Sequence, residues 1–311
     1  MMKHTSVLLQ ECIDSLVIKP NGIYVDGTLG RAGHSSEILK RIPNGHLYCF
    51  DKDQQAILES EGRLAAIGSN FTIIHAGFKN LKSELQNRGV DEIDGLLLDL
   101  GVSSPQFDEA SRGFSYRYDA PLDMRMDQSQ PLSAYEVVNT YEFNELMRIF
   151  YRYGEDSFAK QVARKIEQAR SVKPIETTFE LVDIIKSAYP AKVLNSKGHP
   201  AKKIFQAIRI EVNDELSELE TVLEDALAML KISGRVAVIS FHSLEDRIVK
   251  ETFVRMSSQP KIDKRIPLLP GQLEEAPYRL VTKKPILAGE AELKENNRSH
   301  SAKLRVIERV K

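Results

Sequence analysis

The chain has 311 residues, with 43 Lys+Arg against 44 Asp+Glu and a formal net charge of −1. Its 42% hydrophobic and 28% charged residues are ordinary for a globular protein, and they exclude disorder, collagen and coiled coil as the main structure. The balanced charge excludes a wholly basic nucleic-acid binder but allows an enzyme with local basic patches. Two cysteines are too few for a disulfide scaffold or a four-cysteine zinc site, so we expect a reducing compartment and no metal.

No uncharged run is long and apolar enough to span a bilayer, and Glu11 and Asp14 interrupt the first apolar segment, unlike a signal peptide. We therefore expect a soluble, cytoplasmic protein without a membrane partner. The oligomeric state stays open between monomer and homodimer.

Short apolar runs alternate with helical segments through the first third of the chain. The runs cover residues 22–26, 46–51, 71–75 and 93–98, and acids stand at or just after three of their ends, at Asp26, Asp51 and Asp99. This alternation is typical of a parallel sheet with helices on both faces.

The strand pattern stops from about residue 107 to 215, where only helical stretches are predicted, among them 141–153, 157–170 and 178–187. Strands are predicted again at 234–241, 278–282 and 303–310. A helical insert explains this order better than two consecutive domains. We therefore expect an α/β catalytic domain of residues 1–106 and 216–311, with an inserted all-helical substrate-binding domain of residues 107–215.

The glycine turn after the first run indicates a cofactor site. Gly27, Gly30 and Gly33 let the backbone approach a ligand, and Asp51 follows where an acid would bind ribose hydroxyls. NAD enzymes and S-adenosyl-L-methionine enzymes share these features. The glycine spacing departs from G-x-G-x-x-G, and Asp26 suits a cationic amino acid moiety better than a pyrophosphate. S-adenosyl-L-methionine is favoured, with an NAD-dependent oxidoreductase as the alternative.

A loop after the fourth run indicates the reaction. Ser104-Pro105-Gln106-Phe107 matches three of the four residue types of the [D/N/S]-P-P-[Y/F/W] loop of enzymes that methylate exocyclic amines. A side-chain oxygen and a backbone carbonyl that accept the two amine hydrogens free the nitrogen lone pair for the methyl group. We assign this catalytic role to Ser104 and Pro105. An ordinary turn and an adenine-N6 DNA methyltransferase are alternatives, although the second Pro that the latter expects is absent.

Several longer motifs fall in order along nearly the whole chain. They include Val25-Asp-Gly-Thr-Leu-Gly-Arg-Ala-Gly-His-Ser35, Leu97-Leu-Asp-Leu-Gly-Val-Ser-Ser-Pro-Gln106, Pro121-Leu-Asp-Met-Arg-Met-Asp127 and Ser240-Phe-His-Ser-Leu-Glu-Asp-Arg247. Together they closely resemble the ribosomal RNA small subunit methyltransferase H family. The departures are slight; Ala32, for example, stands where a glycine is common.

This resemblance implies a class I S-adenosyl-L-methionine-dependent methyltransferase with a Rossmann-like sheet. The implied reaction is methyl transfer to N4 of a cytidine in the decoding (P-site) region of 16S rRNA, in the small ribosomal subunit, with no DNA substrate. The resemblance also implies cofactor contacts at Ala32, Gly33, His34, Asp51, Phe78, Asp99 and Gln106. Gln106 has the base as an alternative partner, and Phe78 has a place in the core as an alternative role.

Cations and aromatic residues alternate just after the amine loop, at Arg112, Phe114, Tyr116, Arg117 and Tyr118. This pattern is typical of a surface that holds single-stranded RNA. The alternative is a structured loop in which Arg117 or Arg125 pairs with Asp119, Asp123 or Asp127.

A long helix is predicted to begin at Pro200 and to continue to about residue 230. Residues 191–210 contain five bases and no acid, whereas residues 211–225 contain seven acids and no base, an order that opposes the helix dipole. We therefore expect Lys202, Lys203 and Arg209 to contact RNA phosphates, with a solvated charged face as the alternative.

At the end of the fifth strand, His242 is expected either to touch the substrate or to be a structural histidine. Ser243 and Asp246 are predicted to form the capping box of the next helix. A non-catalytic RNA-binding assembly factor remains the last alternative.

Overall fold

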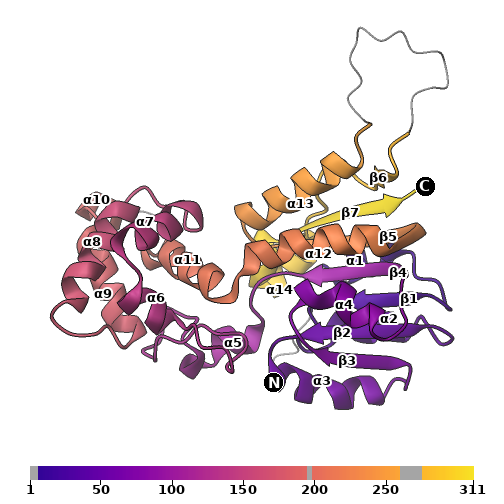
Figure 1. Ribbon diagram of the computed structural model, residues 1–311, viewed down its shortest axis with the longest axis horizontal. Coiled ribbons are helices and arrows are strands. Elements are labelled where there is room, and N and C mark those ends of the chain that lie inside the picture. The colour runs from indigo at the N-terminus through magenta and orange to yellow at the C-terminus, as the bar shows by residue number, and fades with distance from the viewer. Residues whose placement is uncertain (1–5, 195–197, 260–274) are drawn as a thin grey trace, which may run out of the picture. The chain divides into compact units, whose positions relative to one another are not determined.

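The computed structural model describes residues 6–194, 198–259 and 275–311, except for the side chains of Ser104 and Pro105. The chain divides into two compact units, one formed by residues 1–101 and 216–311 and the other by residues 102–215 (Figure 1). The sequence interpretation placed the first boundary slightly later, between residues 106 and 107.

The first unit is built on a seven-stranded sheet in the order β3-β2-β1-β4-β5-β7-β6. β1 to β5 are parallel to one another, whereas β7 runs antiparallel to both β5 and β6. All seven predicted strands are present: β1 (Ile23–Asp26), β2 (His46–Asp51), β3 (Phe71–His75), β4 (Ile93–Asp99), β5 (Leu230–Ser240), β6 (Tyr278–Leu280) and β7 (Lys303–Arg309).

Helices cover both faces of this sheet, which explains the apolar runs in its central strands, such as residues 96–98 of β4 and 236–239 of β5. Successive residues of β4 point to opposite cores: Leu96 and Leu98 pack with one cluster, and Leu97 packs with the other. The first cluster includes side chains of α4 (Leu81–Gln86), α12 (Glu215–Met229) and α13 (Ser243–Met256). The second includes side chains of α1 (Leu9–Leu16), α2 (Gly33–Leu39) and α3 (Gln54–Ala65). A short helix α14 (Glu290–Glu295) precedes β7.

The strand order reverses between β1 and β4, which pair with each other at the centre of the sheet. Asp26 pairs with Cys49 of β2 and with Leu97 of β4, so Asp51 and Asp99 both lie two residues beyond Asp26 at the same edge. In open α/β sheets, ligands bind outside the carboxyl ends of the strands at such a reversal. The topology therefore brings the three predicted acids to one ligand-binding edge.

Within the described residues of the second unit, the regular elements are helices, joined by irregular segments such as residues 113–133 and by one isolated bridge between Pro121 and Thr177. Its longer helices are α6 (Ala134–Thr140), α7 (Phe143–Arg152), α8 (Ala159–Arg170), α9 (Thr178–Ala188) and α11 (Ala201–Asn213), with short helices α5 (Ser104–Asp108) and α10 (Ala191–Leu194). Their apolar faces share one core that includes Ile149, Phe150, Ile166, Ile185 and Ile208. The three predicted helices of the insert correspond to α7, α8 and α9.

The single long helix predicted from Pro200 to about residue 230 is wrong. Asp214 has a left-handed backbone with φ 53°, and it ends α11 before α12 begins at Glu215. Glu215 and Glu218 therefore lie in the first turn of their own helix, where negative charge is favourable. The basic and acidic runs thus belong to two helices, so the argument from one long helix fails, although Lys202 and Lys203 still lie in the first turn of α11, where positive charge is unfavourable.

Candidate active site

The glycine turn after β1 is held in shape by Asp26. Its Oδ1 accepts a hydrogen bond from the Thr28 backbone N–H at 3.0 Å, and its Oδ2 accepts one from the Ser35 hydroxyl at 2.6 Å. Asp26 is 1% exposed. Both of its oxygens thus have partners inside the protein, and its contacts are those of a residue that fixes the turn.

Asp51, at the end of β2, faces the same turn. Its Oδ2 accepts from the Gly30 backbone N–H at 2.8 Å, and its Oδ1 accepts from the Asp53 N–H at 2.9 Å. Burial nevertheless raises the pKa of Asp51 to about 6, against the lowering effect of these two donors. Each oxygen keeps a second lone pair, which is what a ligand carrying hydroxyl groups requires.

Asp99, at the end of β4, has an unsatisfied oxygen. Its Oδ1 is buried and has no hydrogen-bond partner among the described residues, and its Oδ2 lies 3.8 Å from Nδ1 of His34. Burial raises the pKa of Asp99 to about 6, although His34 opposes the shift. A buried carboxylate with an unused oxygen is costly in an empty site and suits a cationic ligand group.

His34, Ala32 and Gly33 form the entry to α2. The His34 Nε2 lies 3.1 Å from the Val7 carbonyl oxygen, which leaves Nδ1 on the side of Asp99. Ala32 is the N-cap and has a left-handed backbone with φ 55°, the conformation that explains why glycine is common at this position. A Cβ built on Gly33 would collide with the Ser6 Oγ, so a larger residue here would require the Ser6 side chain to move.

Phe78 begins a 3₁₀ helix (Phe78–Asn80) after β3 and packs in part against the core. A Cβ built on Gly27 would lie 3.3 Å from the Phe78 Cβ, so Phe78 is next to the glycine turn. The structure therefore brings together six of the seven predicted cofactor residues at one edge of the sheet: Ala32, Gly33, His34, Asp51, Phe78 and Asp99.

The remaining predicted residues of the reaction centre belong to the second unit. Gln106 is buried, and its Oε1 accepts from the Ser103 N–H at 2.9 Å. Ser104 and Pro105 begin the short helix α5, but their side chains lie outside the described part of the structure. Their role as acceptors of amine hydrogens stays a prediction.

His242 caps α13, which corrects the predicted capping box of Ser243 and Asp246. The His242 Nδ1 accepts from the Glu245 N–H at 3.5 Å, while Glu245 Oε2 accepts from the His242 N–H at 3.2 Å. Asp246 instead binds Arg305 at 2.7 Å and Lys303 at 3.0 Å. The side chain of His242 is thus engaged by its own helix.

The predicted RNA-contacting residues of the second unit differ in their surroundings. Arg112 and Phe114 are each 4% exposed; Arg112 donates to the Arg125 and Met126 carbonyls, and Phe114 is part of the core. Arg209 binds both oxygens of Glu215, at 2.8 and 2.9 Å. Lys203 donates to the Glu155 carbonyl at 2.8 Å, whereas Lys202 is exposed.

The sequence interpretation missed the hydroxyl groups that shape the glycine turn. The Thr28 hydroxyl accepts from the Asp99 N–H at 2.7 Å, and the Ser60 hydroxyl donates to the Gly30 carbonyl at 2.7 Å. Thr28 lies within a motif that the sequence singled out, but Ser60 is on α3, thirty residues away, and no local pattern marks it.

A doubly wound sheet with this strand order and an antiparallel β7 is the arrangement of class I methyltransferases, which use S-adenosyl-L-methionine as their methyl donor. The chain matches the model of the MraW methylase family over residues 1–310, and it belongs to that family.

The curated relatives agree along the whole chain. A protein named ribosomal RNA small subunit methyltransferase H from Streptococcus dysgalactiae subsp. equisimilis is 56% identical over 311 residues, covering 99% of this chain and 98% of the relative. One of the same name from Exiguobacterium sibiricum is 55% identical over 311 residues, covering 100% of this chain and 99% of the relative. The predicted fold class, enzyme class and methyl donor are therefore confirmed.

Within the described ranges, every helix is too short or too polar to serve as a membrane span.

Proposed function

We propose that this methyltransferase transfers a methyl group from S-adenosyl-L-methionine to N4 of a cytidine in the decoding region of 16S rRNA. The observation that supports this proposal is the 55–56% identity, over essentially the whole chain, to relatives named ribosomal RNA small subunit methyltransferase H. We also propose that the enzyme acts in the cytoplasm, on the RNA of the small ribosomal subunit.

The donor site fits this cofactor chemically. Asp51 would accept hydrogen bonds from the ribose hydroxyls, as acids at the end of the second strand do in related sheets. The unused Oδ1 of Asp99 would accept from the ammonium of the methionine moiety. Ala32, Gly33 and His34 would bring backbone close to the ligand at the start of α2, and Phe78 would pack on the adenine ring.

The bound cofactor supplies a methyl group on a sulfonium, whose departure as a neutral thioether needs no metal. The Ser104 hydroxyl and the Pro105 carbonyl would accept the two hydrogens of the cytosine N4 amine. These hydrogen bonds would pull the N–H bonds out of the plane of the base. The nitrogen lone pair is then free to attack the methyl carbon in a direct displacement. The extra proton of the product would pass to water.

The decisive experiment is mass mapping of methylated nucleosides in 16S rRNA from cells with and without this protein. We expect N4-methylation of one cytidine in the decoding region to disappear without it and to return when purified protein and labelled S-adenosyl-L-methionine are added. A label on adenine N6, or unchanged cytidine methylation, would contradict the proposal.

Ser104→Ala separates chemistry from cofactor binding. We expect kcat to fall by about 10²-fold or more with an unchanged Kd for S-adenosyl-L-methionine, because the lost contact forms only with the reacting amine. Ser103→Ala, one residue away, is the matched control and should keep full activity. Full activity of Ser104→Ala would remove this residue from the reaction.

A further inference from the structure

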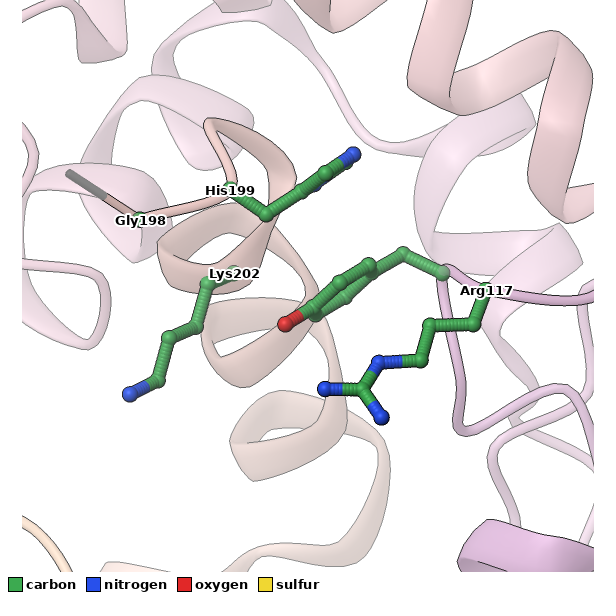
Figure 2. Close-up of a pocket in the computed structure, with 5 residues that line it drawn as sticks. Arg117, Gly198, His199 and Lys202 are labelled. Atoms are coloured by element: carbon green, nitrogen blue, oxygen red, sulfur yellow. The ribbon is translucent and has the colours of Figure 1, made fainter. Parts of the chain in front are cut away.

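An open pocket of about 550 Å³ lies wholly within the helical unit, lined by Tyr116, Arg117, Gly198, His199 and Lys202 (Figure 2). Arg117 comes from the segment before α6, and Lys202 comes from the first turn of α11. Figure 2 shows that Arg117 and Lys202 come from these two separate segments and that the His199 ring extends away from the Lys202 amine. Among the described residues, this lining includes Arg117 and Lys202 as cations and contains no acid.

The two cations are not used by the fold. Arg117 and Lys202 are exposed, and their side chains form no hydrogen bond or ion pair with any residue that the structure describes. The neighbouring Arg125 behaves differently, because its guanidinium binds both oxygens of Asp123 at 2.9 and 2.8 Å. Of the pairings weighed from the sequence, Arg125 with Asp123 forms, whereas Arg117 stays unpaired among the described residues.

The aromatic wall of the pocket is formed by rings in contact. The Tyr116 ring stacks on His199 with centroids 4.3 Å apart and an interplanar angle of 8°. It also meets the buried Phe205 edge-on, at 5.8 Å and 88°. No described residue binds the Tyr116 hydroxyl, which adds a further donor to the pocket.

The pKa of His199 reflects the burial of the ring and the positive charge around the pocket. Burial and the charges of Lys186 and Arg117 lower the pKa of His199. Its Nδ1 accepts from the Ala201 N–H at 3.2 Å, so in the neutral ring the proton is on Nε2. This set of groups fits an anion that is attached to a planar group. The Arg117 and Lys202 cations and the Tyr116 hydroxyl would contact the anion, and the aromatic wall would contact the planar group.

We propose that this pocket binds a backbone phosphate of the RNA substrate, with Arg117 and Lys202 neutralising the charge and the Tyr116–His199 stack supporting the adjoining nucleotide. This inference rests on the proposed function, because it takes RNA as the substrate. It assigns RNA anchoring to residues of the helical unit, whereas the proposed donor-site acids Asp51 and Asp99 belong to the other unit.

The test uses the full chain and the double variant Arg117→Ala/Lys202→Ala. We measure its binding to a single-stranded oligoribonucleotide of about ten nucleotides, a length typical of such sites, over a range of salt concentrations. We expect affinity to fall by about tenfold and the salt slope to decrease by about 1 to 2, since two charges no longer meet the backbone. The KM for rRNA should rise while kcat and the Kd for S-adenosyl-L-methionine stay unchanged.

The matched control is Arg164→Ala/Lys165→Ala. Both residues are exposed on α8 in the same unit, form no ion pair with any described residue, and do not line the pocket. This control removes the same charge, so equal weakening by the two double variants would overturn the proposal. Tyr116→Phe, which keeps the stack but lacks the hydroxyl, should weaken RNA binding by a few fold without unfolding the protein.

A second readout follows His199 directly by NMR, with His199→Gln used for assignment. A phosphate beside the ring favours the protonated imidazole, so the His199 titration should move to higher pH when the oligoribonucleotide is added. The shift should vanish in Arg117→Ala/Lys202→Ala. An equal shift with inorganic phosphate at the same ionic strength would mean a site for a free anion, and equal binding of a polyglutamate peptide would mean a site for acidic protein. Either result overturns the RNA assignment.

The failure of this inference differs from the failure of the proposed function. Wild-type protein that methylates no cytidine would refute the proposed function, whatever the pocket binds. Wild-type protein that methylates rRNA, with an unchanged KM in Arg117→Ala/Lys202→Ala, would refute the phosphate pocket alone.

Discussion

Asp99 Oδ2 lies 3.8 Å from His34 Nδ1, while Asp99 Oδ1 is buried without a hydrogen-bond partner among the described residues. A buried carboxylate oxygen without a partner costs folding free energy, and the proposed contact with the cofactor's ammonium would offset that cost. Such a conflict between folding stability and binding is expected at a site whose carboxylate pairs with a charge on the ligand.

Asp99→Asn should therefore stabilise the empty protein and weaken cofactor binding. The raised pKa, about 6, means that the folded state disfavours the ionised form, so the penalty grows as the pH rises from about 4 to above 6 and is complete at pH 7.5. Because 27% of the side chain is exposed, we expect a gain of about 1 kcal/mol rather than the full linkage value of about 3 kcal/mol.

Thermal unfolding at pH 7.5 and calorimetric titration with S-adenosyl-L-methionine measure these two effects. Asp91→Asn, at an exposed acid just before β4, serves as the control and should change neither quantity. A lower melting temperature for Asp99→Asn would contradict the view that this carboxylate is strained in the empty site.

Cofactor affinity should increase with pH between about 5 and 7. Burial raises the pKa of both Asp51 and Asp99 to about 6, so both carboxyl groups are largely protonated at pH 5 and ionised at pH 7. A cationic ligand prefers the ionised pair, and we expect Kd to fall by about tenfold over this range. Asp99→Asn should flatten the profile measured by titration calorimetry, and a flat profile in the wild type would exclude both groups from the site.

Asp51→Ala should weaken S-adenosyl-L-methionine binding by about 1–3 kcal/mol, since the ribose hydroxyls would lose their acceptor. Asp53→Ala is the matched control. Asp53 lies two residues away, and its Oδ1 accepts from the Gln55 N–H at 3.0 Å as the N-cap of α3. Its loss should cost about 1 kcal/mol of stability and leave the cofactor Kd unchanged. Equal binding losses in the two variants would point to a disordered turn instead of a ribose contact.

Replacing His242 tests whether it is a structural residue. His242→Ala should cost about 1 kcal/mol in the free energy of unfolding, because α13 loses its N-cap. His242→Ser restores a capping oxygen, so it should recover most of that stability and keep methyl transfer. A stable His242→Ser variant without activity would show instead that the imidazole touches the substrate.

Most of the first unit could be predicted from the sequence. Strands such as 46–51 are short, largely apolar runs that follow a glycine and end at an acid, and runs of this length are typical of strands buried on both faces and too short for most buried helices. Helix α6 was missed, although the capping box of Ser133 and Glu136 that begins it is visible in the sequence. Asp26 was expected to face a charged ligand, yet its partner Ser35 becomes its neighbour only when α2 packs on the sheet.

The break at Asp214 shows why the predicted long helix failed. The apolar stripe from Ile204 to Leu230 keeps helical spacing through residue 214, so periodicity alone carries no sign of an end. One left-handed residue divides the stripe between two cores, that of the helical unit for α11 and that of the sheet for α12. The left-handed conformation of Asp214 depends on how α11 and α12 pack, and the spacing of apolar residues carries no information about that packing.

The α/β class, the insert and the acids at the strand ends could be predicted from residue order, because burial and secondary-structure period set the spacing of apolar residues. The motifs spread over nearly the whole chain also identify the family. Which charges are available to a ligand became clear only from the folded arrangement. Arg209 pairs with Glu215, and Arg125 pairs with Asp123, while Arg117 and Lys202 meet at an open pocket unpaired by any described residue. The physical reason is that pairing depends on distances between side chains from separate segments, which a count of charges does not contain.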